Sequence, residues 1–136
     1  MERFEENSYS GAKLSFYRNV PKSAPKAIVH ISHGMAEHAG RYDWFMQTLM
    51  EAGYAVYAHD IRGHGYTHAP DSFKGHFSDK HGLDKLLQDL DFSIHLIKKN
   101  HPNVPIFCFG HSLGSILLLR YATSMYHRIN GIACWN

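Results

Sequence analysis

One short stretch of the chain combines a serine and two glycines in a pattern that could do chemistry. Residues 110–114 read Gly-His-Ser-Leu-Gly, directly after the apolar run at 106–109 and before the apolar run at 116–119. Between a strand and a helix, such glycines let the chain bend sharply where any side chain would collide with neighbouring backbone. We expect this bend to lift the Ser112 hydroxyl above the end of a sheet, where it can serve as a nucleophile. The backbone N–H of Leu113 would face the same space and receive the negative charge of an attacked carbonyl oxygen. The alternative is a tight turn that carries a serine by chance.

The elements around this bend follow from apolar periodicity. Strands are predicted at residues 3–8, 13–19, 27–32, 54–58, 106–109 and 129–135, and helices at 41–52, 83–97 and 115–127. Strands that alternate with helices predict an α/β fold with a mostly parallel sheet and helices on both faces. Residues 1–136 are expected to form part of a single domain.

The same periodicity predicts which side chains are buried. On the helix at 41–52 the apolar positions include Trp44 and Phe45, and on the long helix Lys85, Asp89 and Lys98 are expected to face away from the core. The helix at 115–127 is apolar on nearly every side and is expected to be buried all round.

Three of the predicted strands end in glycine-rich polar turns, at residues 33–38, 60–65 and 110–114. Ligands bind at the carboxyl ends of strands in open α/β sheets, so neighbouring strands would bring these loops to one crevice. The first loop lies where a second oxyanion donor is needed, and we expect the backbone N–H of Met35 to face that of Leu113. An ordinary strand-to-helix connection is the alternative for this loop.

Further polar or small residues on two of these loops are candidates for the substrate pocket. Glu37 and Arg41 are four residues apart and either pair with each other or line the polar end of the pocket. The full set of pocket candidates is His33, Gly34, Glu37, His38, Arg41 and His111.

Composition excludes several classes of protein. With 44% hydrophobic and 19% charged residues the chain is typical of a soluble globular protein, and a net charge of +2 gives no reason to expect nucleic acid as a partner. No secretory signal or membrane-spanning run is present, so a cytoplasmic location is expected. Cys108 and Cys134 are expected to be buried, reduced thiols, with a bridge between them as the alternative.

Twelve histidines raise the question of a metal. The chain has no H-E-x-x-H and no paired-cysteine pattern, and His33, His64 and His111 lie within glycine-flanked loops. We therefore predict no metal site and no cofactor.

Taken in order, the three loops resemble those of α/β-hydrolases of the monoglyceride lipase and lysophospholipase group. That group shows an HGxxEHxxRY loop, a DxRGHGxS loop and a GHSxG turn, which correspond here to residues 33–42, 60–67 and 110–114. Two positions depart from the pattern. Thr67 replaces a serine but keeps a hydroxyl, and Ser115 replaces a glycine, for which we expect a small cost in packing.

The resemblance implies the α/β-hydrolase fold, with Ser112 as the nucleophile and the amides of Met35 and Leu113 as the oxyanion hole. It implies fatty-acid esters of glycerol or a similar small alcohol as substrates. It also implies that the triad acid and histidine follow later strands. The chain would therefore be an N-terminal part that stops after about the sixth strand, lacks the last strands and the cap through which the protein could touch a membrane surface, and is close to inert alone. The competing hypotheses are a non-catalytic binding or regulatory partner and a histidine-rich metal binder.

Overall fold

The computed structural model describes the backbone of all 136 residues and every side chain except that of Tyr126. The elements in chain order are β1 (Glu2–Asn7), β2 (Lys13–Asn19), β3 (Ile28–Ser32), the 3-10 turn η1 (Ala39–Tyr42), α1 (Asp43–Glu51), β4 (Ala55–His59), α2 (Gly82–Asn100), β5 (Ile106–His111), α3 (Leu113–Met125), the 3-10 turn η2 (Tyr126–Arg128) and β6 (Gly131–Trp135). Each predicted strand and helix is present, with ends within a few residues of those expected.

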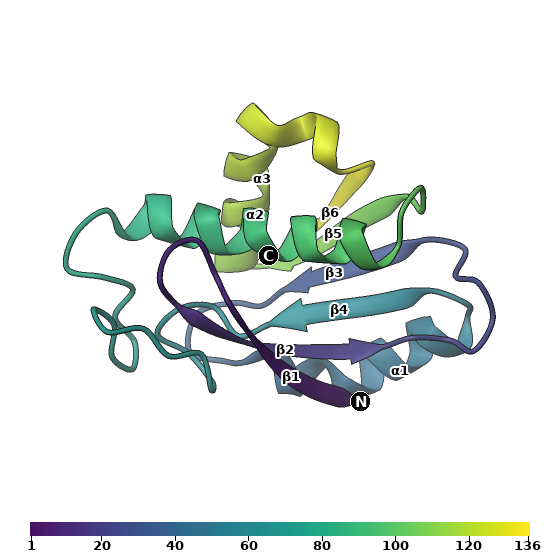
Figure 1. Cartoon of the computed structure of the whole chain (residues 1–136), viewed down its shortest axis with the longest axis horizontal. Coiled ribbons are helices and arrows are strands. Elements are labelled where there is room, and N and C mark those ends of the chain that lie inside the picture. The colour runs from purple at the N-terminus through teal and green to yellow at the C-terminus, as the bar shows by residue number, and fades with distance from the viewer.

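The strands form one sheet in the order β1-β2-β4-β3-β5-β6 (Figure 1). β2 runs antiparallel to both β1 and β4, whereas β4, β3, β5 and β6 are parallel to one another. The prediction of a mostly parallel sheet is confirmed. Because β3 lies between β4 and β5, the three strands that end in glycine-rich turns are neighbours, and Ser32 at the end of β3 pairs with Gly110 of β5.

Helices cover both faces of the sheet, as predicted. α1 packs on one face through Met46, while α2 and α3 pack on the other and bury residues such as Ile94 and Leu118 (Figure 1). Each large apolar side chain buried in this way contributes about 1.5–3 kcal/mol. None of the helices that the structure describes is both long and apolar enough to cross a bilayer.

Two predictions about apolar faces are wrong. α3 buries Leu118 completely, but Ile116 and Leu119 on its other side are 63% and 54% exposed. Only one side of this helix meets the sheet and α2, so apolar residues all round it do not mean burial all round. Trp44 at the start of α1 is likewise 79% exposed, and the core position on that helix belongs to Met46.

Asp89 also lies opposite to its predicted position, because it belongs to a buried ionic network. Its side chain is 1% exposed and pairs with Arg62 at 3.2 Å. The guanidinium of Arg62 is fully buried and donates to Asp71 at 2.7 Å and to the Ser10 hydroxyl at 2.6 Å. Lys85, also expected to face solvent, pairs with Asp71. The network joins α2, the β1–β2 turn and the loop after β4, which fixes that loop.

The two cysteines differ in burial. Cys108 on the central strand β5 is buried, but Cys134 on β6 is exposed because β6 is the edge strand of the sheet. Both thiols are free, so the expectation of two buried thiols is wrong for Cys134.

Candidate active site

Ser112 is the single residue between β5 and α3, and it is exposed. Its φ of 50° lies in the left-handed region, which a residue with a side chain adopts only at an energetic cost. Two backbone hydrogen bonds hold this conformation: the Ser112 N–H donates to the carbonyl of Trp135 at 2.9 Å, and the Ile116 N–H donates to the carbonyl of Ser112 at 3.2 Å. The serine is therefore presented on a strained bend that the end of β6 supports.

The glycines on both sides of this bend leave no room for a side chain. A Cβ atom on Gly114 would lie 1.9 Å from the carbonyl oxygen of Ser32, and one on Gly110 would lie 2.6 Å from the nitrogen of Ser115. Ser115 itself is fully buried, and its hydroxyl donates to the carbonyl of Gly110 at 2.7 Å. Ser115 stands where the related loops usually have a glycine. The hydrogen bond that its side chain gains offsets the packing cost of the added bulk.

The loop after β3 touches this bend. A Cβ on Gly34 would lie 3.0 Å from the imidazole Nδ1 of His111 and 3.3 Å from the His111 carbonyl oxygen, so the two backbones are in close contact. Neither the N–H of Met35 nor that of Leu113 donates a hydrogen bond to any residue that the structure describes. Leu113 is the first residue of α3, where backbone N–H groups have no partner within the helix, and Met35 is on an exposed part of its loop. Two free N–H groups therefore lie on adjoining loops, one of them directly after Ser112.

Glu37 ties these two loops together. Its carboxylate is 10% exposed, and Oε1 accepts hydrogen bonds from the backbone N–H of Gly34, from the Tyr42 hydroxyl at 2.8 Å and from the imidazole Nδ1–H of His111 at 2.9 Å. Arg41 lies 3.7 Å from Oε2. Burial alone would raise the pKa of Glu37, but the hydrogen bonds from His111, Gly34 and Tyr42 outweigh it and hold the pKa below its ordinary value.

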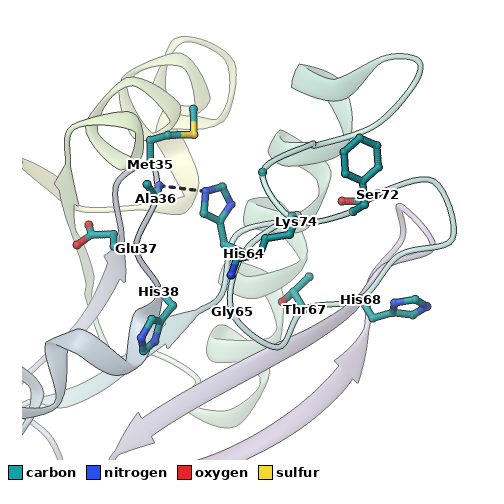
Figure 2. Close-up of a pocket in the computed structure, with 13 residues that line it drawn as sticks. Met35, Ala36, Glu37, His38, His64, Gly65, Thr67, His68, Ser72 and Lys74 are labelled. Carbon is teal, nitrogen blue, oxygen red and sulfur yellow. Dashed lines mark hydrogen bonds between the residues drawn. The ribbon is translucent and has the colours of Figure 1, made fainter.

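His33 and His64 connect the loop after β3 to the loop after β4. His33 is fully buried, donates from Nδ1 to the carbonyl of Gly34 at 2.7 Å and accepts the Ile61 N–H at 2.9 Å. Burial lowers its pKa, which keeps the ring neutral as this pairing requires. His64 accepts the Ala36 N–H at 3.3 Å (Figure 2). His33 thus holds the backbone of the two loops in place.

Sequence reasoning gave no role to Asp60, the first residue after β4. Its buried carboxylate accepts hydrogen bonds from the backbone N–H groups of Ala39 and Tyr66, both at 2.8 Å, and from the Tyr17 hydroxyl at 3.1 Å. A Cβ on Gly65 would lie 2.1 Å from this carboxylate. Burial and the negative charge of Asp60 raise the pKa of Tyr17 to about 12. The sequence feature that could have predicted this role is the presence of Asp60 and Gly65 in the same loop.

A cavity of about 720 Å³ lies between the loops after β3 and β4 (Figure 2). Met35, Glu37 and His38 line it from one loop, and residues between 63 and 75 line it from the other. The other pocket candidates, His33, Gly34, Arg41 and His111, are not part of its lining, and neither is Ser112. The spacing of Glu37 and Arg41 left two roles open for Glu37, and it has both. It pairs with the Arg41 guanidinium, and it lines this cavity.

The described side chains leave the Ser112 hydroxyl without a hydrogen-bond partner. They also contain no group of three or more His, Cys, Asp or Glu residues placed to hold a metal ion.

Comparison with known proteins identifies consistent relatives. The sequence profile of the family described as serine aminopeptidase, S33, matches residues 23–136. A monoglyceride lipase of Rattus norvegicus is 32% identical over 112 residues, which are 82% of this chain and 35% of that protein. A monoacylglycerol lipase of Mycolicibacterium smegmatis is 32% identical over 119 residues, which are 85% of this chain and 40% of that protein. The chain thus spans between a third and two fifths of these relatives.

Solved structures agree. A thermostable carboxyl esterase from Bacillus coagulans, in complex with glycerol, superposes with a TM-score of 0.84 at 29% identity over 98% of this chain and 43% of that one. An epoxide hydrolase from Vigna radiata superposes with a TM-score of 0.79 at 21% identity over 98% of this chain and 37% of that one, a likeness of fold alone.

Proposed function

The chain belongs to the serine aminopeptidase S33 family and has the α/β-hydrolase fold, and from this membership we propose that it carries the nucleophile of a serine hydrolase that cleaves carboxylic esters. One observation carries the proposal: an exposed serine held at a φ of 50° follows directly on the loop contact between Gly34 and His111, with the free N–H groups of Met35 and Leu113 on the two loops. A strained serine beside unpaired amides is an arrangement suited to acyl transfer.

The reaction begins when the Ser112 oxygen attacks the ester carbonyl carbon and gives up its proton to a base. Negative charge then develops on the former carbonyl oxygen, and the N–H groups of Met35 and Leu113 stabilise it. The tetrahedral intermediate breaks its bond to the alcohol, which leaves with a proton, and the acyl group stays on Ser112. Water attacks this acyl-enzyme in the same way and releases the acid.

We propose that the base comes from residues outside these 136, because none of the described histidines hydrogen-bonds to the Ser112 hydroxyl. Both ring nitrogens of His33 are occupied. The Nδ1–H of His111 donates to Glu37, and its Nε2 makes no hydrogen bond to Ser112. Loss of the histidine base from a serine triad lowers turnover by about six orders of magnitude and leaves about 10³–10⁴ over water. The chain by itself should therefore be close to inert.

The substrate class is a fatty-acid ester of glycerol or a similar small alcohol. Two relatives carry the names monoglyceride lipase and monoacylglycerol lipase, and the carboxyl esterase was solved with glycerol. Lysophospholipids have the same ester on a glycerol backbone and remain within this class.

The test is covalent labelling with a fluorophosphonate, whose fluoride the serine oxygen displaces. A chain extended beyond residue 136 to include the base should be labelled, and its Ser112→Ala variant should not. The Ser124→Ala variant, altered at an exposed serine of α3, should be labelled like the parent. Labelling that persists in Ser112→Ala, or a parent chain that is never labelled, would overturn the proposal, and the second result would favour a non-catalytic binding role.

A further inference from the structure

The N–H groups on both sides of Met35 are occupied by side chains, while its own N–H is free. The N–H of Gly34 donates to the Glu37 carboxylate, and the N–H of Ala36 donates to Nε2 of His64 at 3.3 Å (Figure 2). The Met35 N–H donates to no residue among those the structure describes. Glu37 and His64 thus bind the amides on either side of Met35 and leave the Met35 amide available.

His64 reaches Ala36 at a strained point of the backbone. Ala36 has a φ of 59°, in the left-handed region that residues with a side chain rarely adopt. The His64 ring is itself fixed, because its Nδ1–H donates to the carbonyl of Arg62 at 3.2 Å and its face stacks on Phe77 with ring centres 6.0 Å apart. Only the neutral ring with its proton on Nδ1 can accept the Ala36 N–H, so His64 holds the strained conformation from the loop after β4.

Glu37 fixes the same loop relative to the bend at Ser112. The Oε1 atom that accepts the Gly34 N–H also accepts the Nδ1–H of His111 at 2.9 Å, and His111 directly precedes Ser112. A Cβ on Gly34 would lie 3.0 Å from both of these bonded atoms, so the loop backbone lies against this hydrogen bond. Loss of the hydrogen bond between Glu37 and His111 removes a direct link between the two loops.

We infer that Glu37 and His64 are positioning residues that hold the Met35 N–H opposite the Leu113 N–H. The inference rests on the proposed function, because it gives these two amides their role in stabilising the oxyanion. Neither side chain touches the reacting atoms, and each acts through the backbone of residues 34–36.

The charge of Glu37 separates this role from a simple electrostatic one. A carboxylate near an oxyanion opposes the negative charge that develops there, so neutralising it would leave turnover unchanged or raise it if charge were its only effect. A positioning role predicts the opposite. In Glu37→Gln the three donors that share Oε1 meet a neutral amide oxygen, a weaker acceptor than a carboxylate, and an NH₂ group replaces the Oε2 that faces Arg41, so turnover should fall.

The experiment measures kcat and KM for hydrolysis of p-nitrophenyl butyrate by the extended chain. Glu37→Met and His64→Leu remove the acceptors and should each lower kcat by about tenfold to a hundredfold, with KM nearly unchanged, because a displaced oxyanion donor weakens only transition-state binding. His64→Gln can still accept the Ala36 N–H and donate to the Arg62 carbonyl, so it should restore most of kcat. Matched controls at exposed positions of α1 and α2, Glu51→Gln and His95→Gln, should behave like the parent.

A second measurement needs no activity. In the 136-residue chain, NMR hydrogen exchange should show a protected Ala36 amide that loses its protection in His64→Leu and keeps it in His64→Gln. Unchanged kcat in both Glu37→Met and His64→Leu, or a Glu37→Gln variant faster than the parent, would overturn the inference. The proposed function would still stand as long as labelling depends on Ser112. Loss of that labelling dependence would instead refute the proposed function itself.

Discussion

Two buried histidines make the stability of this protein depend on pH. His30 on β3 and His59 on β4 are both buried, with His30 Nε2 3.3 Å from His59 Nδ1, and the Ser93 hydroxyl lies 2.8 Å from the same Nδ1. Among the described residues, Nδ1 of His30 is the buried side-chain atom that lacks a hydrogen-bond partner. A second proton on His30 would therefore have no acceptor. Burial holds the pKa of His30 at about 4 against an ordinary 6.5, and burial and neighbouring imidazoles hold that of His59 well below 6.5.

The sign and size of the effect follow from linkage. Below pH 6.5 the unfolded chain binds protons that the folded chain does not. The contribution of these two histidines to stability is therefore constant above neutral pH and falls as the pH drops from 6.5 toward 4. For His30 alone, a folded pKa of about 4 makes unfolding easier by about 2 kcal/mol at pH 5 than at pH 7. His59 adds a loss of the same sign.

The assay is urea unfolding followed by far-UV circular dichroism between pH 8 and pH 5. Far-UV dichroism suits this chain because Trp44 and Trp135 are 79% and 67% exposed and report little of the core. His30→Leu keeps a side chain of similar volume without a titratable group, so its unfolding free energy should fall by about 2 kcal/mol less than that of the parent over this range. His95→Gln, at an exposed site on α2, should show the pH dependence of the parent. Equal stability of the parent at pH 5 and pH 7, or equal losses in the parent and His30→Leu, would refute the reasoning.

Three other predictions concern the bend at Ser112, the buried ionic network and the thiols. In urea unfolding, Gly114→Ala should lower the free energy of unfolding by about 4 kcal/mol or more, because its Cβ would lie 1.9 Å from the carbonyl oxygen at the end of β3. The control Gly11→Ala has a φ of 84° and no neighbour within 4 Å, so it should cost only about 1–2 kcal/mol. Arg62→Met should cost about 3–5 kcal/mol because it leaves the buried carboxylate of α2 unpaired, and an unfolding midpoint equal to that of the parent would contradict this. A colorimetric thiol reagent should modify Cys134 in the native protein and reach Cys108 only after denaturation, so two reactive thiols in the native state would show the burial to be wrong.

Local features of the chain were sufficient to predict the order of its elements. The alternation of compact apolar runs with helical periodicity placed the strands and helices, and residues 110–114 predicted the bend at Ser112. These features act over a few residues, because backbone conformation and side-chain direction repeat with fixed periods. The contacts of Gly110 and Gly114 with adjacent backbone are the physical counterpart of that pattern.

Predictions from periodicity were wrong where burial depends on a distant partner. Asp89 has the spacing of a solvent-facing residue, yet it is buried because Arg62, 27 residues away, occupies the space above it. Trp44 and Leu119 fit apolar faces but meet no covering layer among the described residues. Periodicity identifies the face of a helix and cannot say whether another element covers it.

The sequence by itself determined the serine, its glycines and the loops that accompany them, because each is encoded within a few consecutive residues. The tertiary structure alone decided that β3 lies between β4 and β5, that Glu37 reaches His111 across 74 residues and that His64 reaches Ala36 across 28. Hydrogen bonds between loops depend on strand order and register, and these are properties of the whole sheet.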